Sequence, residues 1–166
     1  PLLATDQVPI HPLRLCKEVR DFMDRDAILV VDGQEILNFG RQSIPSFVPG
    51  HRINSGPFGT MGVGLPFGVG AKAAKPDKQV IVLHGDGSFG MTAFDMETAN
   101  RFGAPYIAVI GNNSAMNQIR YGQLAKYGLV EEARGRGFAT EALLGVLVPC
   151  DADGVRIRAS IAPHNA

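Results

Sequence analysis

The chain has 166 residues, of which 45% are hydrophobic and 19% charged, and its 16 basic and 16 acidic side chains give a net charge of zero. This length suffices for one domain with a buried core. The balanced charge argues against nucleic acid as a partner. No apolar stretch reaches the ~18–20 residues that span a membrane, and two cysteines cannot form a disulfide framework. A cytoplasmic protein is expected.

Hydrophobic periodicity, glycines and prolines predict helices that alternate with strands after an extended segment at residues 1–10. The expected helices cover residues 13–24, 36–47, a stretch from the glycine-rich loop to about residue 75, and 91–102; the expected strands cover residues 27–31, 52–54, 79–83 and 106–110. The order strand, helix, strand predicts right-handed parallel βαβ units. The predicted fold class is therefore α/β, with a parallel sheet flanked by helices.

Four unusual loops each follow an expected strand, and together they predict one composite site. They cover residues 32–35, 55–62, 84–88 and 111–115, and the glycines of the chain concentrate in and around the middle two. In an open parallel sheet, ligands bind at the loops beyond the carboxyl ends of the strands.

The sequence Gly-Asp-Gly-Ser at residues 85–88 predicts a site for a phosphate and a cation. A strand that turns directly into a helix offers free N–H groups to phosphate. Asp86 would place a carboxylate beside that phosphate, which makes sense only with a cation between them, and Mg²⁺ bridges protein oxygens to phosphates in this way. Asn112 and Asn113 follow the next strand along and could add a ligand. Taken singly, each motif is also typical of a plain turn.

These motifs together resemble the thiamine diphosphate-dependent enzymes. The resemblance includes the 55–62 loop (Ser-Gly-Pro-Phe-Gly-Thr-Met-Gly), Leu65-Pro66 and the Asp32-Gly33-Gln34 loop, and it runs from about residue 9 to residue 128. Within these enzymes, it resembles the cofactor-binding domain of the acetolactate synthase and 2-hydroxyacyl-CoA lyase branch. It implies a thiamine diphosphate-binding fold, which we expect to be incomplete in this chain.

The resemblance implies a role for individual residues. The metal ligands for Mg²⁺ would be Asp86, Asn113 and the carbonyl of Ala115. The cofactor-binding residues would be Gln34, Gly59, Met61, Gly85, Asp86, Gly87, Ser88 and Asn113: the amides of Gly87 and Ser88 hold the diphosphate, Met61 props the bent cofactor and the carbonyl of Gly59 accepts a hydrogen bond from the aminopyrimidine. Glu35 stands where many relatives have histidine, and we leave it out of the site because an acid beside phosphate is unfavourable.

The resemblance also implies partners. Such enzymes use a glutamate from a separate pyrimidine-binding domain, usually on a partner subunit, and a middle domain where CoA is a substrate. Both would lie before Pro1, so we expect a fragment of a larger enzyme, a homodimeric parent and no catalytic residue or activity in this chain alone.

The remaining 129–166 segment resembles part of another family, the N-acetyltransferases. Arg134, Gly137 and Ala139 match the loop that holds the pyrophosphate of acetyl-CoA, and a strand is expected at residues 155–161. A plain Arg-Gly loop before an amphipathic helix is the alternative. We therefore expect residues 1–128 to form the cofactor-binding domain and residues 129–166 to be a fused helix-strand segment that completes the sheet. An acetyl-CoA-binding fragment and an inactive folded chimera remain alternative functions.

Other signals are weaker. A dinucleotide site from Gly62, Gly64 and Gly68 lacks a clean preceding strand and the usual acidic residue. For His84 we expect a hydrogen-bonded structural role, and for Cys16 a place in the core.

Overall fold

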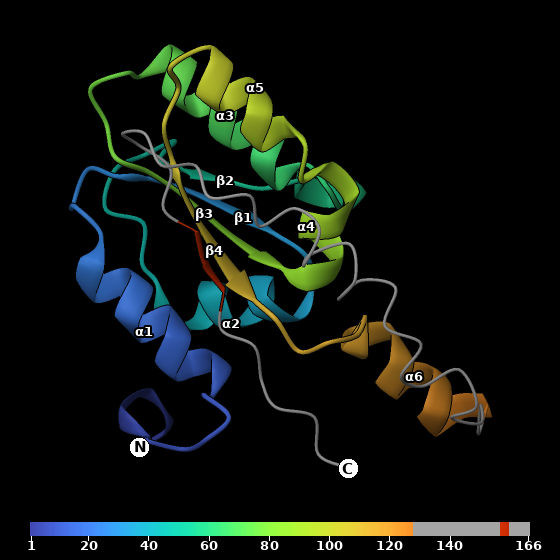
Figure 1. The fold of residues 1–166 in the computed structure, drawn as a ribbon. Coiled ribbons are helices and arrows are strands. Elements are labelled where there is room, and N and C mark those ends of the chain that lie inside the picture. The colour runs from blue at the N-terminus through green and yellow to red at the C-terminus, as the bar shows by residue number, and fades with distance from the viewer. Residues whose placement is uncertain (128–156, 160–166) are drawn as a thin grey trace.

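A five-stranded parallel sheet forms the centre of the computed structural model, which describes residues 1–127 and 157–159 (Figure 1). The strands are β1 (Ile28–Asp32), β2 (Arg52–Ile53), β3 (Val80–Gly85), β4 (Ile107–Gly111) and β5 (Ile157–Ala159). The helices are α1 (Pro12–Phe22), α2 (Glu35–Ser43), α3 (Gly64–Ala74), α4 (Asp86–Thr92), α5 (Asp95–Arg101) and α6 (Asn117–Tyr127), with short 3₁₀ turns η1 (Leu2–Ala4) and η2 (Gly56–Phe58). The predicted α/β class is confirmed.

The strand order β2-β1-β3-β4-β5 makes β3 the central strand. β1 and β4 flank it in register, with Asp32 beside His84 and Gly85 beside Gly111. The chain leaves β1 through α2 toward β2, whereas it leaves β3 through α4 and α5 toward β4 in the opposite direction. The sheet therefore has a topological switch point between the carboxyl ends of β1 and β3, the place where open α/β sheets bind ligands.

Helices cover both faces of the sheet, with α1 and α2 on one side and α3, α4 and α5 on the other (Figure 1). Alternate residues of β3 supply the two cores: Val80 and Val82 pack under α3 to α5, and Ile81 and Leu83 pack under α1 and α2. All four side chains are at most 1% exposed. A central strand buried on both faces explains the continuous apolar run in the sequence.

The helices differ from the predicted ones in several places. The helix expected over 36–47 ends at Ser43 as α2, and the one expected over 91–102 is divided into α4 and α5. The helix expected from residue 91 starts five residues earlier as α4, at Asp86, because Gly85 ends the strand in an extended conformation and the chain turns helical at once. α6 was not predicted, and its apolar residues show little segregation to one face. Among the described residues, no helix has the length and apolar character needed to cross a membrane.

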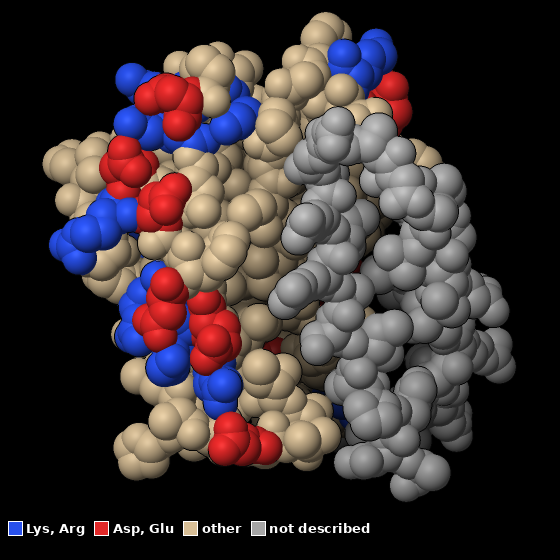
Figure 2. Space-filling view, turned by 60° about the vertical axis from the view of Figure 1, so that its left-hand side comes forward, with Lys and Arg blue, Asp and Glu red and all other residues tan. Residues whose placement is uncertain are grey.

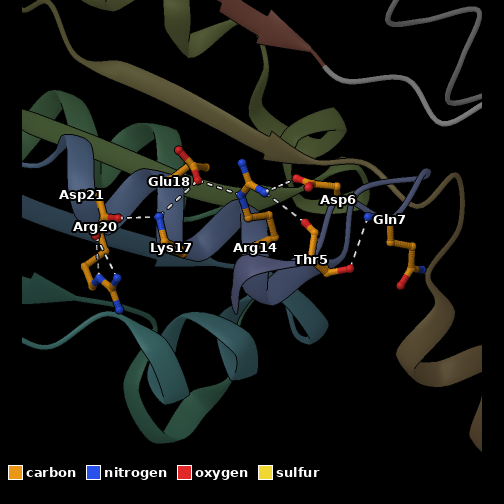
Figure 3. A network of polar contacts seen from close by, with 8 residues as sticks. All are labelled: Thr5, Asp6, Gln7, Arg14, Lys17, Glu18, Arg20 and Asp21. Carbon is orange, nitrogen blue, oxygen red and sulfur yellow. Dashed lines mark hydrogen bonds and ion pairs between the residues drawn. The ribbon is translucent and has the colours of Figure 1, made fainter. Parts of the chain in front are cut away.

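Ion pairs link the N-terminal segment to the outer surface of α1 (Figure 3). Nη1 of Arg14 donates to Oδ1 of Asp6 and to the carbonyl of Thr5, both at 3.0 Å. Further along the helix, Lys17 pairs with Asp21 at 2.7 Å. On the face shown in Figure 2, small groups of basic and acidic side chains alternate in the same way. Exposed pairs of this kind add little stability individually.

The close approach of α3 to β3 gives a first testable prediction. A Cβ at Gly68 would lie 2.6 Å from Cγ2 of Val82, so Gly68→Ala should lower the free energy of unfolding by about 1–3 kcal/mol through overpacking. Gly70 lies on the same helix with nothing within 4 Å of its Cβ position, so the control Gly70→Ala should gain about 0.5–1 kcal/mol from helix propensity. Urea unfolding measures both changes. Equal effects of the two substitutions would contradict this close packing.

Candidate functional site

The loops that follow β1, β3 and β4 meet at one edge of the sheet, as the sequence predicted for parallel strands. In Figure 1 this edge lies on the side of α4 and of the start of α6. The loops after β1 and β4 lie on either side of the 85–88 turn, because β1 and β4 lie on either side of β3. The switch point and the motif-bearing turn therefore coincide.

Asp86 is the centre of this edge. It is the first residue of α4 and only 7% exposed, and its Oδ1 accepts a hydrogen bond from the N–H of Gly87 at 2.9 Å. Burial raises the pKa of Asp86, and nearby backbone N–H groups, including those of Ser114 and Ala115, act against this shift. No cationic side chain forms an ion pair with Asp86 in the described part of the chain. A buried carboxylate without a cationic partner fits a bound metal ion.

The loop after β4 is organised by its own side chains. Oδ1 of Asn112 accepts from the N–H of Ser114 at 2.8 Å, and Ser114 adopts the left-handed conformation with φ 59°. Nδ2 of Asn117, at the start of α6, donates to the carbonyl of Asn113 at 3.1 Å. These bonds organise the loop that carries Ser114 and Ala115, whose N–H groups lie near Asp86.

Asn113 also contacts Glu35, a residue that was not expected in the site. Its Nδ2 donates a hydrogen bond to Oε2 of Glu35, the first residue of α2. The negative charge of Glu35 predicts repulsion from phosphate, but it does not predict a hydrogen bond to Asn113. The structure thus places Glu35 beside Asn113, one of the predicted site residues.

The loop after β1 approaches the 85–88 turn closely at Gly33. Gly33 has φ +93°, and a Cβ there would lie 3.3 Å from both the backbone nitrogen of Gly85 and Oγ of Ser88. Only glycine fits both the conformation and the space. Ser88 is 1% exposed and donates to the carbonyl of Gly85 at 3.1 Å. Gln34 follows Gly33 and is exposed at the same edge.

The glycine-rich loop at residues 55–62 is held at its end by one buried and one partly buried hydrogen bond. Oδ2 of Asp32, at the end of β1, accepts from the N–H of Gly64 at 2.8 Å. The hydroxyl of Thr92, at the end of α4, donates to the carbonyl of Gly62 at 2.9 Å. Neither residue was predicted to have this role, because each acts on a segment distant in the sequence.

Two methionines cover the backbone of the 85–88 turn. Cε of Met61 lies 3.7 Å from the Cβ position of Gly87, and Cγ and Cε of Met116 lie 3.4 Å from it. Met61 therefore reaches the turn, and so does Met116, which had no sequence signal. Gly59 is exposed with φ 62°, a conformation that favours glycine.

His84 differs from its expected role. It is 0% exposed, neither ring nitrogen has a hydrogen-bond partner among the described residues, and the ring packs edge-on against Phe89 with 5.1 Å between the centroids. Burial lowers the pKa of His84 to about 3. The prediction of a hydrogen bond was wrong, and the neutral ring cannot offer a positive charge to phosphate at physiological pH.

The donor set fits a hard cation such as Mg²⁺. The predicted ligands are all oxygen atoms, from the carboxylate of Asp86, the amide of Asn113 and the backbone carbonyl of Ala115. Within residues 1–127 and 157–159, no group of three or more His, Cys, Asp or Glu side chains could form a different metal site. Cys16 is buried in the core as expected. Arg134, Gly137 and Ala139 lie outside the described residues.

The sequence matches the family described as thiamine pyrophosphate enzyme, C-terminal TPP binding domain, over residues 37–160. It is 36% identical over 126 residues to a probable acetolactate synthase of Mycobacterium bovis, covering 76% of this chain and 23% of the relative. It is 32% identical over 121 residues to the 2-hydroxyacyl-CoA lyase 1 of Mus musculus, covering 70% and 21%. With the 2-hydroxyacyl-CoA lyase 2 of Bos taurus the identity is 35% over 119 residues, covering 72% and 19%.

The chain thus spans less than a quarter of the length of these relatives. The family match continues through residues 129–160, which include most of the segment that we compared with N-acetyltransferases. None of the relatives named above is an acetyltransferase.

Proposed function

Because this chain belongs to the thiamine pyrophosphate enzymes, as their C-terminal cofactor-binding domain, we propose that its 85–88 turn and its 112–115 loop bind the cofactor diphosphate through Mg²⁺. The observation that carries the proposal is Asp86, a buried carboxylate without a cationic partner among the described residues. Asp86, Asn113 and the carbonyl of Ala115 would be the protein ligands of Mg²⁺, which commonly joins one or two carboxylates to substrate phosphates.

The other residues at this edge would bind and orient the cofactor. The amides of Gly87 and Ser88 would donate to the diphosphate, with Gly85 allowing its close approach and Gln34 beside it. Met61, which lies over Gly87, would support the bent cofactor from below. The carbonyl of Gly59 would accept a hydrogen bond from the aminopyrimidine. The bound cofactor supplies carbanion-stabilising chemistry.

The reaction of the whole enzyme belongs to this proposal as well. Relatives named acetolactate synthase and 2-hydroxyacyl-CoA lyase favour the formation or cleavage of a carbon–carbon bond. A pyrimidine-binding domain with its glutamate, and a middle domain, would complete the enzyme as a homodimer in the cytoplasm. This chain supplies the metal and diphosphate half of such a site and would be inactive without the other domains.

Residues 1–128 would form this cofactor-binding domain, and residues 129–166 would complete its sheet. In support, β5 comes from the second segment and pairs in parallel with β4, with Ile157 beside Ala108. A chimeric origin with an acetyl-CoA-binding loop at Arg134, Gly137 and Ala139 is the alternative. Coenzyme A binding that is lost in Gly137→Leu would support that alternative.

Calorimetric titration of thiamine diphosphate into the full chain tests the proposed function. Heat of binding in Mg²⁺ that disappears in EDTA is the expected result. The melting temperature should rise with cofactor only when Mg²⁺ is present, because a ligand stabilises the state that binds it. If the titration gives no heat and the melting temperature does not rise at millimolar cofactor and Mg²⁺, cofactor binding by this chain is refuted.

A further inference from the structure

Glu35 and Asn113 form a hydrogen bond across the end of the central strand. Glu35 follows β1 and Asn113 follows β4, and these strands lie on opposite sides of β3. The bond therefore passes over the carboxyl end of β3, where Asp86 begins α4. No other side-chain hydrogen bond among the described residues joins these two loops.

The first turn of α2 is fixed in place independently of this bond. Ile36, the residue after Glu35, is 6% exposed and packs over Gly111 at the end of β4. A Cβ at Gly111 would lie 3.0 Å from Cδ1 of Ile36, so the absence of a side chain there lets the helix come this close. Packing of Ile36 thus carries the neighbouring carboxylate to the loop after β4.

The chemistry of a carboxylate determines which atom of Asn113 it contacts. An ionised carboxylate only accepts hydrogen bonds, so Glu35 binds Nδ2 and leaves Oδ1 of the amide as the free acceptor. A cation requires that oxygen. Without Glu35, the amide group could rotate and present Nδ2 to the cation. The backbone of Asn113 is already held by Asn117. The side-chain amide of Asn113 is then the group whose orientation Glu35 can fix.

We propose that Glu35 is a positioning residue, which holds the Asn113 amide so that Oδ1 faces the cation beside Asp86. This inference rests on the proposed function and goes beyond it by giving a role to a residue whose charge alone would oppose diphosphate binding. Hydrogen bonds from outside the metal shell orient ligands in this way, and their loss typically weakens metal binding by about 10–100-fold.

A double-mutant cycle on the full chain tests the proposal, with Mn²⁺ as the probe and saturating thiamine diphosphate. Free Mn²⁺, followed by electron paramagnetic resonance, gives the affinity. Glu35→Ala should weaken Mn²⁺ binding by about 10-fold, and Glu35→Gln, which keeps an acceptor oxygen, should recover most of it. In an Asn113→Ala background, Glu35→Ala should have no further effect, because residues that act through one another are not additive.

Two controls separate positioning from charge and from folding. Glu97→Ala removes an exposed glutamate from α5 and should leave the Mn²⁺ affinity unchanged. The side-chain amide signals of Asn113 in a ¹⁵N spectrum, assigned by their loss in Asn113→Ala, should move in Glu35→Ala without any metal present.

The outcomes also distinguish the two proposals. If the unaltered chain binds Mn²⁺ with the cofactor but the effects of the two substitutions add, Glu35 acts by charge and the positioning role is wrong. Unmoved amide signals in Glu35→Ala would contradict it as well. If the unaltered chain binds no Mn²⁺ with the cofactor, the proposed function fails, and the positioning role fails with it.

Discussion

Asp86→Asn should abolish the cation-dependent binding of thiamine diphosphate and raise the melting temperature of the unbound chain. Substitutions outside a metal shell often weaken binding by about 10–100-fold, so the loss of a direct carboxylate ligand should exceed about 100-fold. Calorimetry in Mg²⁺ measures the affinity. Differential scanning calorimetry without ligand measures the stability.

The gain in stability follows from the pKa of Asp86. Burial raises the pKa in the folded chain, so the folded state disfavours the ionised form. As the pH rises through the ordinary carboxyl pKa and then the raised one, the unfolded state loses its proton first, and the folded state becomes less stable. At neutral pH the charge is therefore destabilising, and a neutral amide removes that penalty. Functional sites commonly lower the stability of the folded protein in this way.

A matched control distinguishes this effect from a general loss of charge. Asp24 is exposed before β1, and Asp24→Asn should change neither the cofactor affinity nor the melting temperature appreciably. Cation-dependent binding that survives in Asp86→Asn would remove Asp86 from the metal site. A fall in the melting temperature of the unbound variant would contradict the destabilising role of the buried charge.

Asp32→Ala should lower the free energy of unfolding by about 2–4 kcal/mol, since each buried hydrogen-bond donor left without a partner costs about 1–3 kcal/mol. Asp32 is 2% exposed, with Oδ1 accepting from Gly33 at 2.6 Å and Oδ2 from Gly64 at 2.8 Å. Asp32→Asn should not restore the stability, because its NH₂ group would face one of the two N–H donors. Urea unfolding measures each variant.

The consequence of losing Asp32 should extend to the cofactor site. Its contact with Gly64 fixes the start of α3 and therefore the end of the glycine-rich loop, which carries Gly59 and Met61. Cofactor affinity should fall together with stability, whereas Gly68→Ala should lower stability with little change in affinity. Asp24→Ala serves as the surface control. A loss below about 1 kcal/mol in Asp32→Ala would show that water or other groups satisfy these donors.

Much of the fold could be predicted because its signals are local. The apolar run before Gly85 identifies a buried strand. α6 escaped prediction because its apolar residues do not separate clearly onto one face. The start of α4 was missed for another reason: glycines at positions 87 and 90 lower the helix propensity, and only the attachment of this segment to β3 makes it helical.

The residues around the site also fall into two groups, those with a recognisable sequence pattern and those whose contacts only the structure shows. Asp86, Asn113 and Gly33 carry recognisable patterns and lie at one edge, as expected. For Glu35 the sequence indicates only charge repulsion from phosphate, and its hydrogen bond to Asn113 becomes visible only in the structure. His84 was misjudged because a buried histidine usually has a hydrogen-bond partner.

By itself, the sequence determined the α/β class, the succession of strands and the loops that carry oxygen ligands, since these depend on periodicity and on turn residues that act over a few positions. Only the tertiary structure decided which loops touch. With β3 between β1 and β4, Glu35 meets Asn113 over Asp86, and Thr92 holds the carbonyl of Gly62. Such contacts depend on the order of the strands and on close approaches at glycine, which arise when the whole chain packs and leave no periodic trace in the sequence.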